Sequence, residues 1–106
     1  MLEEEEVKST LIMMEPLRQT FIIKNIRGLH ARAAALLVQA TERLNAAVYL
    51  YSGDLKADGK SILSVLSLAC PQNSKITVEA FGEDAVDVLN EIGRLIESGF
   101  GEDGYE

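Results

Sequence analysis

The sequence predicts a single α+β domain in which helices cover one side of a β-sheet. A chain of 106 residues, 47% of them hydrophobic, is large enough for one core and too small for a second. Alternating apolar residues predict four strands, and apolar residues three or four positions apart predict three helices. The order is strand, helix, strand, strand, helix, strand, helix. A split βαβ layout, in which a late strand pairs between earlier ones, fits that order among several arrangements.

A strand and a helix flank the first turn. Residues 20–24 are rich in β-branched and aromatic side chains, which favours a strand, and the turn-prone residues 25–28 follow. Just after His30, apolar residues recur at spacings of four, three and four and predict an amphipathic helix of about fourteen residues. Those apolar positions are Ala33, Leu37, Ala40 and Leu44.

A hairpin and a short helix come next. Residues 47–51 alternate, with Val48 and Leu50 on one face and tyrosines on the other, and a turn leads to a return strand over 55–58. Ser61 suits the N-cap of a helix over 61–68, which Pro71 prevents from running on.

A strand and a helix complete the domain. Residues 75–81 predict a strand, and residues 83–98 predict a helix that Gly99 ends at the C′ position. In the strand, Ile76, Val78 and Ala80 are expected to face inward and Thr77 and Glu79 outward. The apolar face of the helix consists of Ala85, Leu89, Ile92 and Ile96.

The net charge of −7 is concentrated at the two ends of the chain. Residues 1–16 carry −4 and residues 102–106 carry −3. We therefore expect an acidic, flexible N-terminal extension over 1–18, a domain over 19–101 and an acidic C-terminal tail from residue 102 onward. The first half of the domain is moderately basic, which favours an anionic ligand or an acidic protein partner.

Several classes of protein are excluded. Cys70 is the only cysteine and cannot form an internal disulfide, and no apolar run approaches the roughly 20 residues of a membrane span. No arginine-rich or aromatic-interleaved stretch indicates a nucleic-acid binder. One histidine and one cysteine cannot supply the usual four ligands of a metal site. We expect a cytoplasmic protein without membrane insertion, nucleic acid, metal or cofactor, and a monomer by default.

His30 is the only histidine, and it stands where a helix is about to begin. Unpaired N–H groups and the positive end of the helix dipole attract an anion such as phosphate to this position. Arg32 could add a charged fork of donors to the same oxygens. Neutral imidazole is a nucleophile near neutral pH, so His30 is a candidate to carry a phosphoryl group. The alternative is a histidine that caps the helix or decorates a loop.

Ser61 suggests a parallel hypothesis. A phosphate on an N-cap serine would meet the helix dipole favourably and add about two negative charges to the surface, which could switch partner binding. The alternative is a plain N-cap that contributes about 1 kcal/mol. The helix that follows is almost wholly apolar, so its exposed part could dock a partner.

Two motifs in this order resemble the HPr family, the histidine phosphocarrier proteins of the bacterial phosphoenolpyruvate:sugar phosphotransferase system. Residues 28–32, Gly-Leu-His-Ala-Arg, are similar to the family's active-site turn, and residues 59–68 are similar to its regulatory-serine helix. The resemblance covers residues 20–101. It implies an open-faced β-sandwich, a four-stranded antiparallel sheet covered on one face by three helices.

By this resemblance the chain is a stoichiometric phosphoryl carrier and not an enzyme. His30 would accept a phosphoryl group on Nδ1 from phosphorylated Enzyme I and pass it to an EIIA domain for sugar uptake, while Arg32 would steady the group. Ser61 matches the serine that an HPr kinase/phosphorylase modifies. The expected partner-binding residues are Leu29, Arg27, Ile62, Leu63 and Leu66.

Two residues depart from the family's pattern. Ala33 stands where the family usually has proline, which pre-sets φ in the first helical turn, so alanine should loosen the geometry of the site. Arg27 stands where the family often has a small polar residue, and its charge could strengthen phosphate binding. The long acidic extension is also atypical, and Met14 leaves open whether residues 1–13 are translated.

A second hypothesis uses the same surface. A regulatory HPr-like module, of the nitrogen-branch or catabolite-control type, would bind and control a kinase or a transcription regulator without moving sugar. Phosphorylation at His30 or Ser61 would set its state. The sequence separates the two hypotheses poorly, and it leaves open the sugar, the EII proteins served and the presence of a Ser61 kinase. A small structural domain with an unused histidine is a third alternative.

Overall fold

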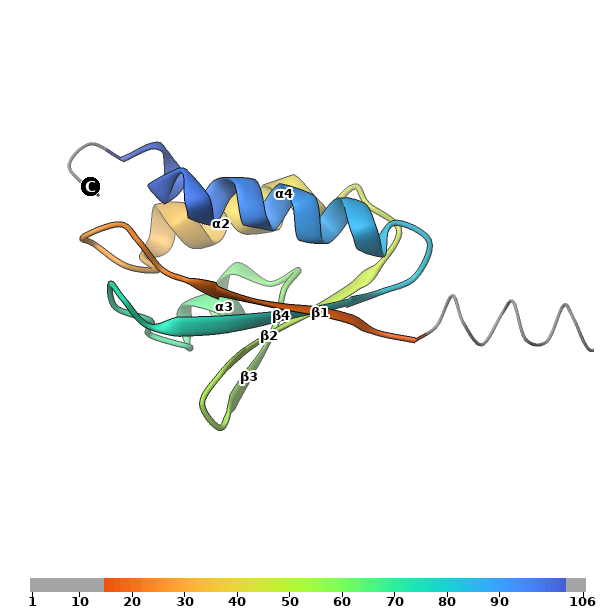
Figure 1. Ribbon diagram of the computed structural model, residues 1–106, viewed down its shortest axis with the longest axis horizontal. Helices are drawn as coiled ribbons and strands as arrows, with labels where there is room; N and C mark the ends of the chain where they lie inside the picture. Colours follow the sequence, from red (N-terminus) through yellow and green to blue (C-terminus); the bar gives the residue numbers. More distant parts are fainter. Residues whose placement is uncertain (1–14, 103–106) are drawn as a thin grey trace, which may run out of the picture.

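The computed structural model describes residues 15–102. Its elements are β1 (Leu17–Ile22), α2 (Ala31–Thr41), β2 (Ala47–Ser52), β3 (Leu55–Asp58), α3 (Ile62–Leu66), β4 (Lys75–Phe81), α4 (Ala85–Glu97) and a 3₁₀ turn η1 (Gly99–Gly101). The α+β element order predicted from the sequence is confirmed (Figure 1). Within residues 15–102, no helix is long and apolar enough to cross a membrane.

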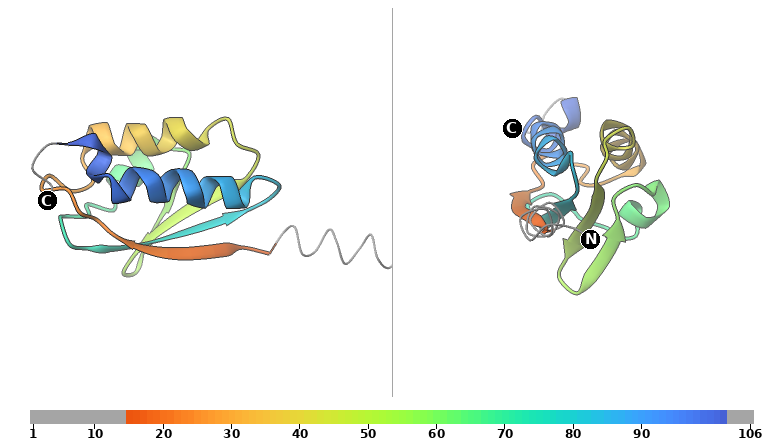
Figure 2. Two further views of the ribbon diagram at one scale, coloured as in Figure 1. Left: turned by 45° about the horizontal axis from the view of Figure 1, so that its top comes forward. Right: turned by 90° about the vertical axis from the view of Figure 1, so that its right-hand side faces the viewer.

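The four strands form one antiparallel sheet in the order β1-β4-β2-β3. The last strand in the sequence, β4, therefore pairs between the first and the second, as in the split layout. Helices α2 and α4 lie side by side over one face of the sheet, and α3 packs against α2 and β3 (Figures 1 and 2). Within residues 15–102, no helix lies over the other face of the sheet, so the sandwich is open-faced.

The core lies between the sheet and the helices. The three inward positions expected on β4 are fully buried, as are the two expected on β2: Ile76, Val78, Ala80, Val48 and Leu50. On α4, which packs against β1 and β4, Ile92 and Ile96 are also buried, as the spacing predicted. Val88 is also fully buried although it was not assigned to the apolar face of the helix.

The open face of the sheet carries aromatic and charged side chains. Tyr49 stacks on Phe81 with ring centroids 6.0 Å apart. Glu79 was expected to face outward, and it lies on this face but is only 7% exposed. Arg18 Nε donates to one of its carboxylate oxygens at 2.7 Å, and the Tyr51 hydroxyl donates to the other at 3.1 Å. These two longer side chains cover the carboxylate and satisfy it.

The start of the domain differs from the prediction. β1 begins at Leu17, so the strand predicted over 20–24 starts three residues earlier, inside the extension expected over 1–18. The first four residues of β1 are exposed and show no alternation, because pairing with β4 holds this edge strand. The Thr20 and Thr77 hydroxyls add a 2.9 Å hydrogen bond between the two strands. Residues 1–14 of the extension lie outside the described residues.

Helix ends were predicted less well than helix caps. α2 has 11 residues where about fourteen were expected. The Thr41 hydroxyl donates to Leu37 O at 3.1 Å, and Leu44 N donates to Thr41 O, so the chain turns out of the helix before Leu44. In contrast, Ser61 caps α3, and Gly99 has φ 62° directly after the C-cap of α4, both as predicted.

Candidate functional site

The turn before α2 is fixed by contacts with the rest of the fold. Gly28 N donates to Asn25 O at 3.1 Å, and Asn25 Nδ2 donates to Gly28 O at 2.8 Å. Gly28 has φ 68°, and a Cβ at this position would lie 2.4 Å from the carbonyl oxygen of Cys70. Leu29 N donates to that same oxygen at 2.8 Å. Position 28 therefore requires glycine both for its backbone conformation and for this close approach.

His30 is the N-cap residue of α2. Its backbone is extended (φ −88°, ψ −178°), and its Nδ1 accepts a 3.2 Å hydrogen bond from the backbone N–H of Arg32. Its carbonyl oxygen accepts the first intrahelical bond, from Ala34 N, at 2.9 Å. His30 thus does cap the helix. The Nδ1 lone pair points at the N-terminus of the helix. The atom that caps the helix is therefore also the atom expected to act as the nucleophile.

A carboxylate lies on the other side of the imidazole ring. Glu102 Oε2 pairs with His30 Nε2. Both side chains are largely buried, with 15% of His30 and 12% of Glu102 exposed. The second carboxylate oxygen, Oε1, accepts a 3.1 Å hydrogen bond from Asn25 Nδ2. The ring of His30 is therefore held at both of its nitrogens.

Arg32 lies beside the same carboxylate. Its Nη2 donates to Glu102 Oε2 at 3.1 Å and to Phe100 O at 2.9 Å, while half of its side chain remains exposed. The structure thus brings Arg32 and His30 together, as the sequence predicted. It also ties both of them to the C-terminal segment.

That segment reaches the site through a tight turn directly after α4 (Figure 1). Gly99, Phe100 and Gly101 have φ values of 62°, 55° and 70°, so three consecutive residues adopt the left-handed region. Phe100 is the residue for which this conformation is unfavourable, and burial of its ring, which is 2% exposed, offsets the strain. The turn places Glu102 beside the N-terminus of α2.

Electrostatics keep the Glu102 carboxylate ionised. Burial raises its pKa, but hydrogen bonds from His30, Asn25 and Arg32 and the charge of His30 outweigh burial and hold the pKa of Glu102 below its ordinary value of 4.5. An ionised carboxylate only accepts hydrogen bonds, so all of its neighbours here act as donors.

Sequence reasoning missed two residues of this site. Asn25 was interpreted only as part of a turn, and Glu102 was assigned to the acidic tail over 102–106. The structure corrects the second assignment, because Glu102 packs against the domain. His30 and Glu102 are 72 positions apart, and no local pattern connects them. Residues 103–106 lie outside the part of the chain that the structure describes.

Ser61 lies at a second predicted site, the N-terminus of α3. Its Oγ accepts a 3.2 Å hydrogen bond from Ser64 N, which confirms the predicted N-cap. Ser64 Oγ in turn accepts a 2.8 Å bond from Asp58 N. The start of the short helix is thereby fixed to the end of β3.

Four of the five expected partner-binding residues reach the surface. Leu63 is 80% exposed and Ile62 is 39% exposed. Arg27 is exposed, and Leu66 is partly buried against the core. Leu29 is different: it is 4% exposed and packs within the core. We therefore remove Leu29 from the expected docking surface, and its role is to anchor the turn that precedes His30.

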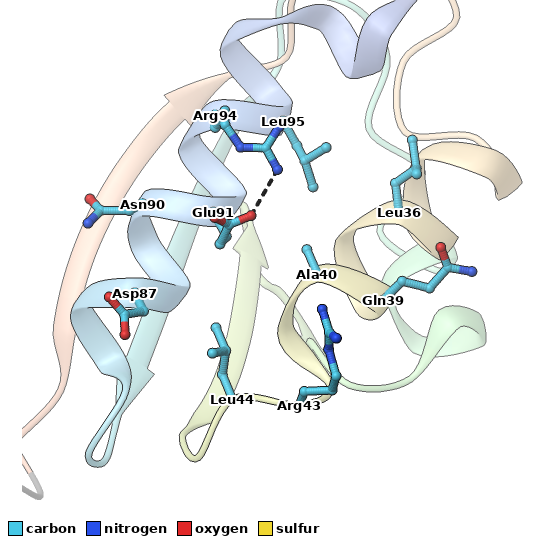
Figure 3. Close-up of a pocket in the computed structure, with 10 residues that line it drawn as sticks. All are labelled: Leu36, Gln39, Ala40, Arg43, Leu44, Asp87, Asn90, Glu91, Arg94 and Leu95. Atoms are coloured by element: carbon cyan, nitrogen blue, oxygen red, sulfur yellow. Dashed lines mark hydrogen bonds and ion pairs between the residues drawn. The ribbon is translucent and has the colours of Figure 1, made fainter.

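A groove of about 630 Å³ lies between α2 and α4, away from these residues (Figure 3). It is lined by Leu36, Gln39, Ala40, Arg43, Leu44, Asp87, Asn90, Glu91, Arg94 and Leu95. On the α4 side of the groove, Arg94 Nη2 donates to Glu91 Oε2 at 2.8 Å. The groove contains none of the site residues predicted from the sequence.

A comparison with protein families identifies the chain. The family model described as "PTS HPr component phosphorylation site" matches residues 17–98. The protein belongs to the HPr family, the phosphocarrier proteins of the phosphotransferase system. The resemblance noted from the two motifs is confirmed.

Individual relatives differ in length. The phosphocarrier protein HPr of Chlamydia pneumoniae is 34% identical over 98 residues, which cover 92% of this chain and 91% of that protein. The multiphosphoryl transfer protein of Haemophilus influenzae is 36% identical over 85 residues, which cover 77% of this chain but only 17% of that protein. The chain therefore matches nearly all of one relative and a small part of the other.

Solved structures confirm the open-faced sandwich. HPr from Thermoanaerobacter tengcongensis is 36% identical, with a TM-score of 0.78 over 82% of this chain and 98% of that one. Crh, the catabolite repression protein of Bacillus subtilis, is 31% identical, with a TM-score of 0.63 over 78% of this chain and 95% of that one.

Proposed function

We propose that this chain is a stoichiometric phosphoryl carrier, which accepts a phosphoryl group on His30 Nδ1 from phosphorylated Enzyme I and passes it to an EIIA-type domain for sugar uptake. The observation that carries the proposal is the placement of Nδ1. It is an acceptor atom directed at the N-terminus of α2, where backbone N–H groups and the helix dipole favour an anion. Membership of the HPr family supports the same reaction.

Arg32 would steady the transferred group. Its guanidinium is half exposed beside His30, and Nη2 is the only one of its three nitrogens for which the described residues show a bond. A guanidinium has five N–H donors, so Arg32 could contact phosphoryl oxygens and remain bonded to Phe100 O.

The first test is phosphorylation by Enzyme I and phosphoenolpyruvate, followed by intact-mass measurement. We expect one added phosphate that acid removes, and its loss in His30→Ala. Because His30 is the only histidine, an acid-labile phosphate on that variant would contradict the assignment.

A pair of arginine variants tests the role of Arg32. Arg32→Ala should slow transfer by about tenfold to a thousandfold, the scale of single electrostatic contacts in catalysis. Arg43→Ala is the control, because Arg43 is exposed beyond the opposite end of α2 and should transfer at the wild-type rate. Equal rates for the two variants would exclude Arg32 from the reaction.

We further propose that Ser61 is a regulatory phosphorylation site. A phosphate there would add about two negative charges next to the exposed Ile62 and Leu63. Incubation with an HPr kinase and ATP should add one acid-stable phosphate. Ser61→Ala should abolish the addition, whereas Ser67→Ala, an exposed serine at the other end of the same helix, should keep it.

The proposed docking surface combines Arg27 with Ile62, Leu63 and Leu66. Leu63 is the most exposed apolar residue of this surface, at 80%. Val86 on α4 is a matched control, because it is also apolar and is 60% exposed. Leu63→Ala should weaken binding to Enzyme I and to EIIA domains, whereas Val86→Ala should not. Equal affinities for the two variants would place docking elsewhere.

Similarity to Crh supports a second candidate function, a regulatory module that binds a catabolite-control regulator and moves no sugar. In that function Ser61 phosphorylation would create binding to the regulator, and His30→Ala would leave this binding intact. Titration of the regulator with both phosphorylated forms distinguishes the functions. Binding only by the Ser61-phosphorylated protein, together with no uptake of phosphate from Enzyme I, would favour the regulatory module.

A further inference from the structure

The group that faces His30 Nε2 is the Glu102 carboxylate, which comes from the C-terminal end of the domain sequence. We propose that Glu102 is a positioning residue for phosphoryl transfer: it holds the imidazole proton on Nε2 and so leaves Nδ1 unprotonated at the N-terminus of α2. The inference rests on the proposed function of His30 as the acceptor and adds a residue to it.

Two hydrogen bonds define the same tautomer of His30. The Glu102 carboxylate can only accept, so Nε2 must be the protonated nitrogen of the ring. On the opposite side, the backbone N–H of Arg32 can only donate, so Nδ1 must present its lone pair. The neutral ring therefore has its nucleophilic atom at the helix N-terminus and its proton at Glu102.

Glu102 is itself held in place by donors from separate parts of the chain. Asn25 Nδ2, in the turn before α2, donates to Oε1 at 3.1 Å. Arg32 Nη2, in the first turn of α2, donates to Oε2 at 3.1 Å. Because only 12% of the Glu102 side chain is exposed, rotation of the carboxylate would break bonds that water could not fully replace. The orientation of the His30 ring is thus determined by a fixed acceptor.

The same carboxylate favours the phosphorylated ring. During transfer the Nδ1 lone pair gives up its hydrogen bond from Arg32 N and forms a bond to phosphorus. The bond between phosphorus and the donor breaks, and its electron pair stays on the donor. The proton on Nε2 of His30 remains, so the ring gains positive charge as the new bond forms. Glu102 lies next to that charge and stabilises it more than it stabilises the neutral ring.

Nuclear magnetic resonance of the imidazole tests the assignment without any phosphoryl donor. His30 is the only histidine, so long-range ¹H–¹⁵N spectra of the ring report on it alone. At a pH where the ring is neutral, we expect one tautomer, protonated at Nε2, with a proton protected from solvent exchange. Glu102→Ala should lose this protection. Glu102→Gln should keep part of it, because an amide oxygen still accepts a hydrogen bond.

Transfer rates from Enzyme I supply the second readout. Glu102→Ala should slow phosphorylation by about tenfold to a hundredfold, with Glu102→Gln in between, as for other residues that orient a reacting group. Glu97→Gln is the control, since Glu97 is an exposed carboxylate at the end of α4 that pairs with Lys24. It should change neither the spectrum nor the rate.

Three results would overturn the inference: a wild-type ring protonated at Nδ1, an equally protected Nε2 proton in Glu102→Ala, or faster transfer by that variant. Faster transfer would mean that Glu102 withholds Arg32 from the phosphoryl group. Failure of the wild type to take phosphate from Enzyme I would instead contradict the proposed function, and the spectra alone would then decide whether Glu102 fixes the tautomer.

Discussion

Asn25 and Glu102 are joined by a 3.1 Å hydrogen bond, from Asn25 Nδ2 to Glu102 Oε1, across 77 positions of sequence. The same amide nitrogen donates to Gly28 O at 2.8 Å, and the Asn25 side chain is fully buried. One amide group therefore connects the turn that presents His30 with the C-terminal segment that faces it. The stability of the fold and the geometry of the site depend on the same bonds.

Replacement of this amide should destabilise the protein. Asn25→Ala removes a donor from two acceptors in a buried setting, so we expect the free energy of unfolding in urea to fall by about 1–3 kcal/mol. Asn90→Ala, at an exposed position of α4, should change it by no more than about 0.5 kcal/mol.

A double-mutant cycle isolates the bond between the two side chains. Once Glu102→Ala has removed the acceptor, Asn25→Ala should cost less than it does alone, with a coupling of about 0.5–3 kcal/mol. Strictly additive losses would show that the bond contributes no stability of its own.

Gly28 and Gly53 provide a matched pair for the turn before α2. Both have positive φ, 68° and 58°, but a Cβ at Gly53 meets nothing within 4 Å, whereas one at Gly28 would lie 2.4 Å from Cys70 O. Gly53→Ala should cost about 1–2 kcal/mol for the left-handed conformation alone. Gly28→Ala should cost more, because either the turn or the segment at Cys70 must move. Equal urea midpoints for the two variants would mean that the chain around Gly28 and Cys70 adjusts to the added Cβ without loss of stability.

The depressed pKa of Glu102 predicts a contribution to stability that acid removes. Because the pKa in the folded state lies below the ordinary value of 4.5, the ionised carboxylate stabilises the fold above that value. The contribution is lost as pH falls through the folded-state pKa. The groups that face the carboxylate are His30, Arg32 and Asn25, and Arg32 stays charged throughout.

The comparison of wild type with Glu102→Gln measures this contribution. The difference between their free energies of unfolding should be fully present above pH 4.5 and should shrink as pH falls further and the wild-type carboxylate becomes protonated. Urea unfolding at a series of pH values provides the measurement, with Glu97→Gln as an exposed control. A difference that does not vary with pH would contradict the expected protonation.

Local patterns allowed most of the fold to be predicted. Alternation over 75–81 and the N-cap at Ser61 involve residues that are neighbours in sequence, and the structure has both where they were expected. The beginning of β1 was missed because Leu17 is exposed and its strand is held by pairing with β4, which leaves no periodic signal. Burial of Glu79 was missed for a similar reason, since the side chains that cover it come from other strands.

The candidate site was predicted only in its local part. The spacing of His30 and Arg32 placed both at the start of a helix, and the structure agrees. The role of Glu102 could not be predicted, because its contact with His30 depends on the left-handed turn at Phe100. Burial of the Phe100 side chain stabilises that turn. A single sequence carries no local signal for a contact between residues 72 positions apart.

Ala33 allows the departure from the family's usual proline to be tested. It is the third residue of α2, where a backbone N–H has no acceptor within the helix, so proline removes no intrahelical bond. Ala33→Pro should raise the free energy of unfolding by about 0.4–1 kcal/mol, because proline restricts the unfolded chain. It should also slow hydrogen exchange at Ala34 N, which donates to His30 O at 2.9 Å.

Ala35→Pro is the matched control, two residues further along the same helix. The fifth N–H of α2 belongs to the hydrogen-bonded ladder, so proline at 35 should cost about 3 kcal/mol or more. Ala33 is fully buried, and the extra ring carbons must therefore fit against the core. If Ala33→Pro lowered stability, the packing around Ala33 would have adapted to alanine. The geometry at His30 would then depend on Gly28 and Glu102, and not on a preset φ in the first turn of the helix.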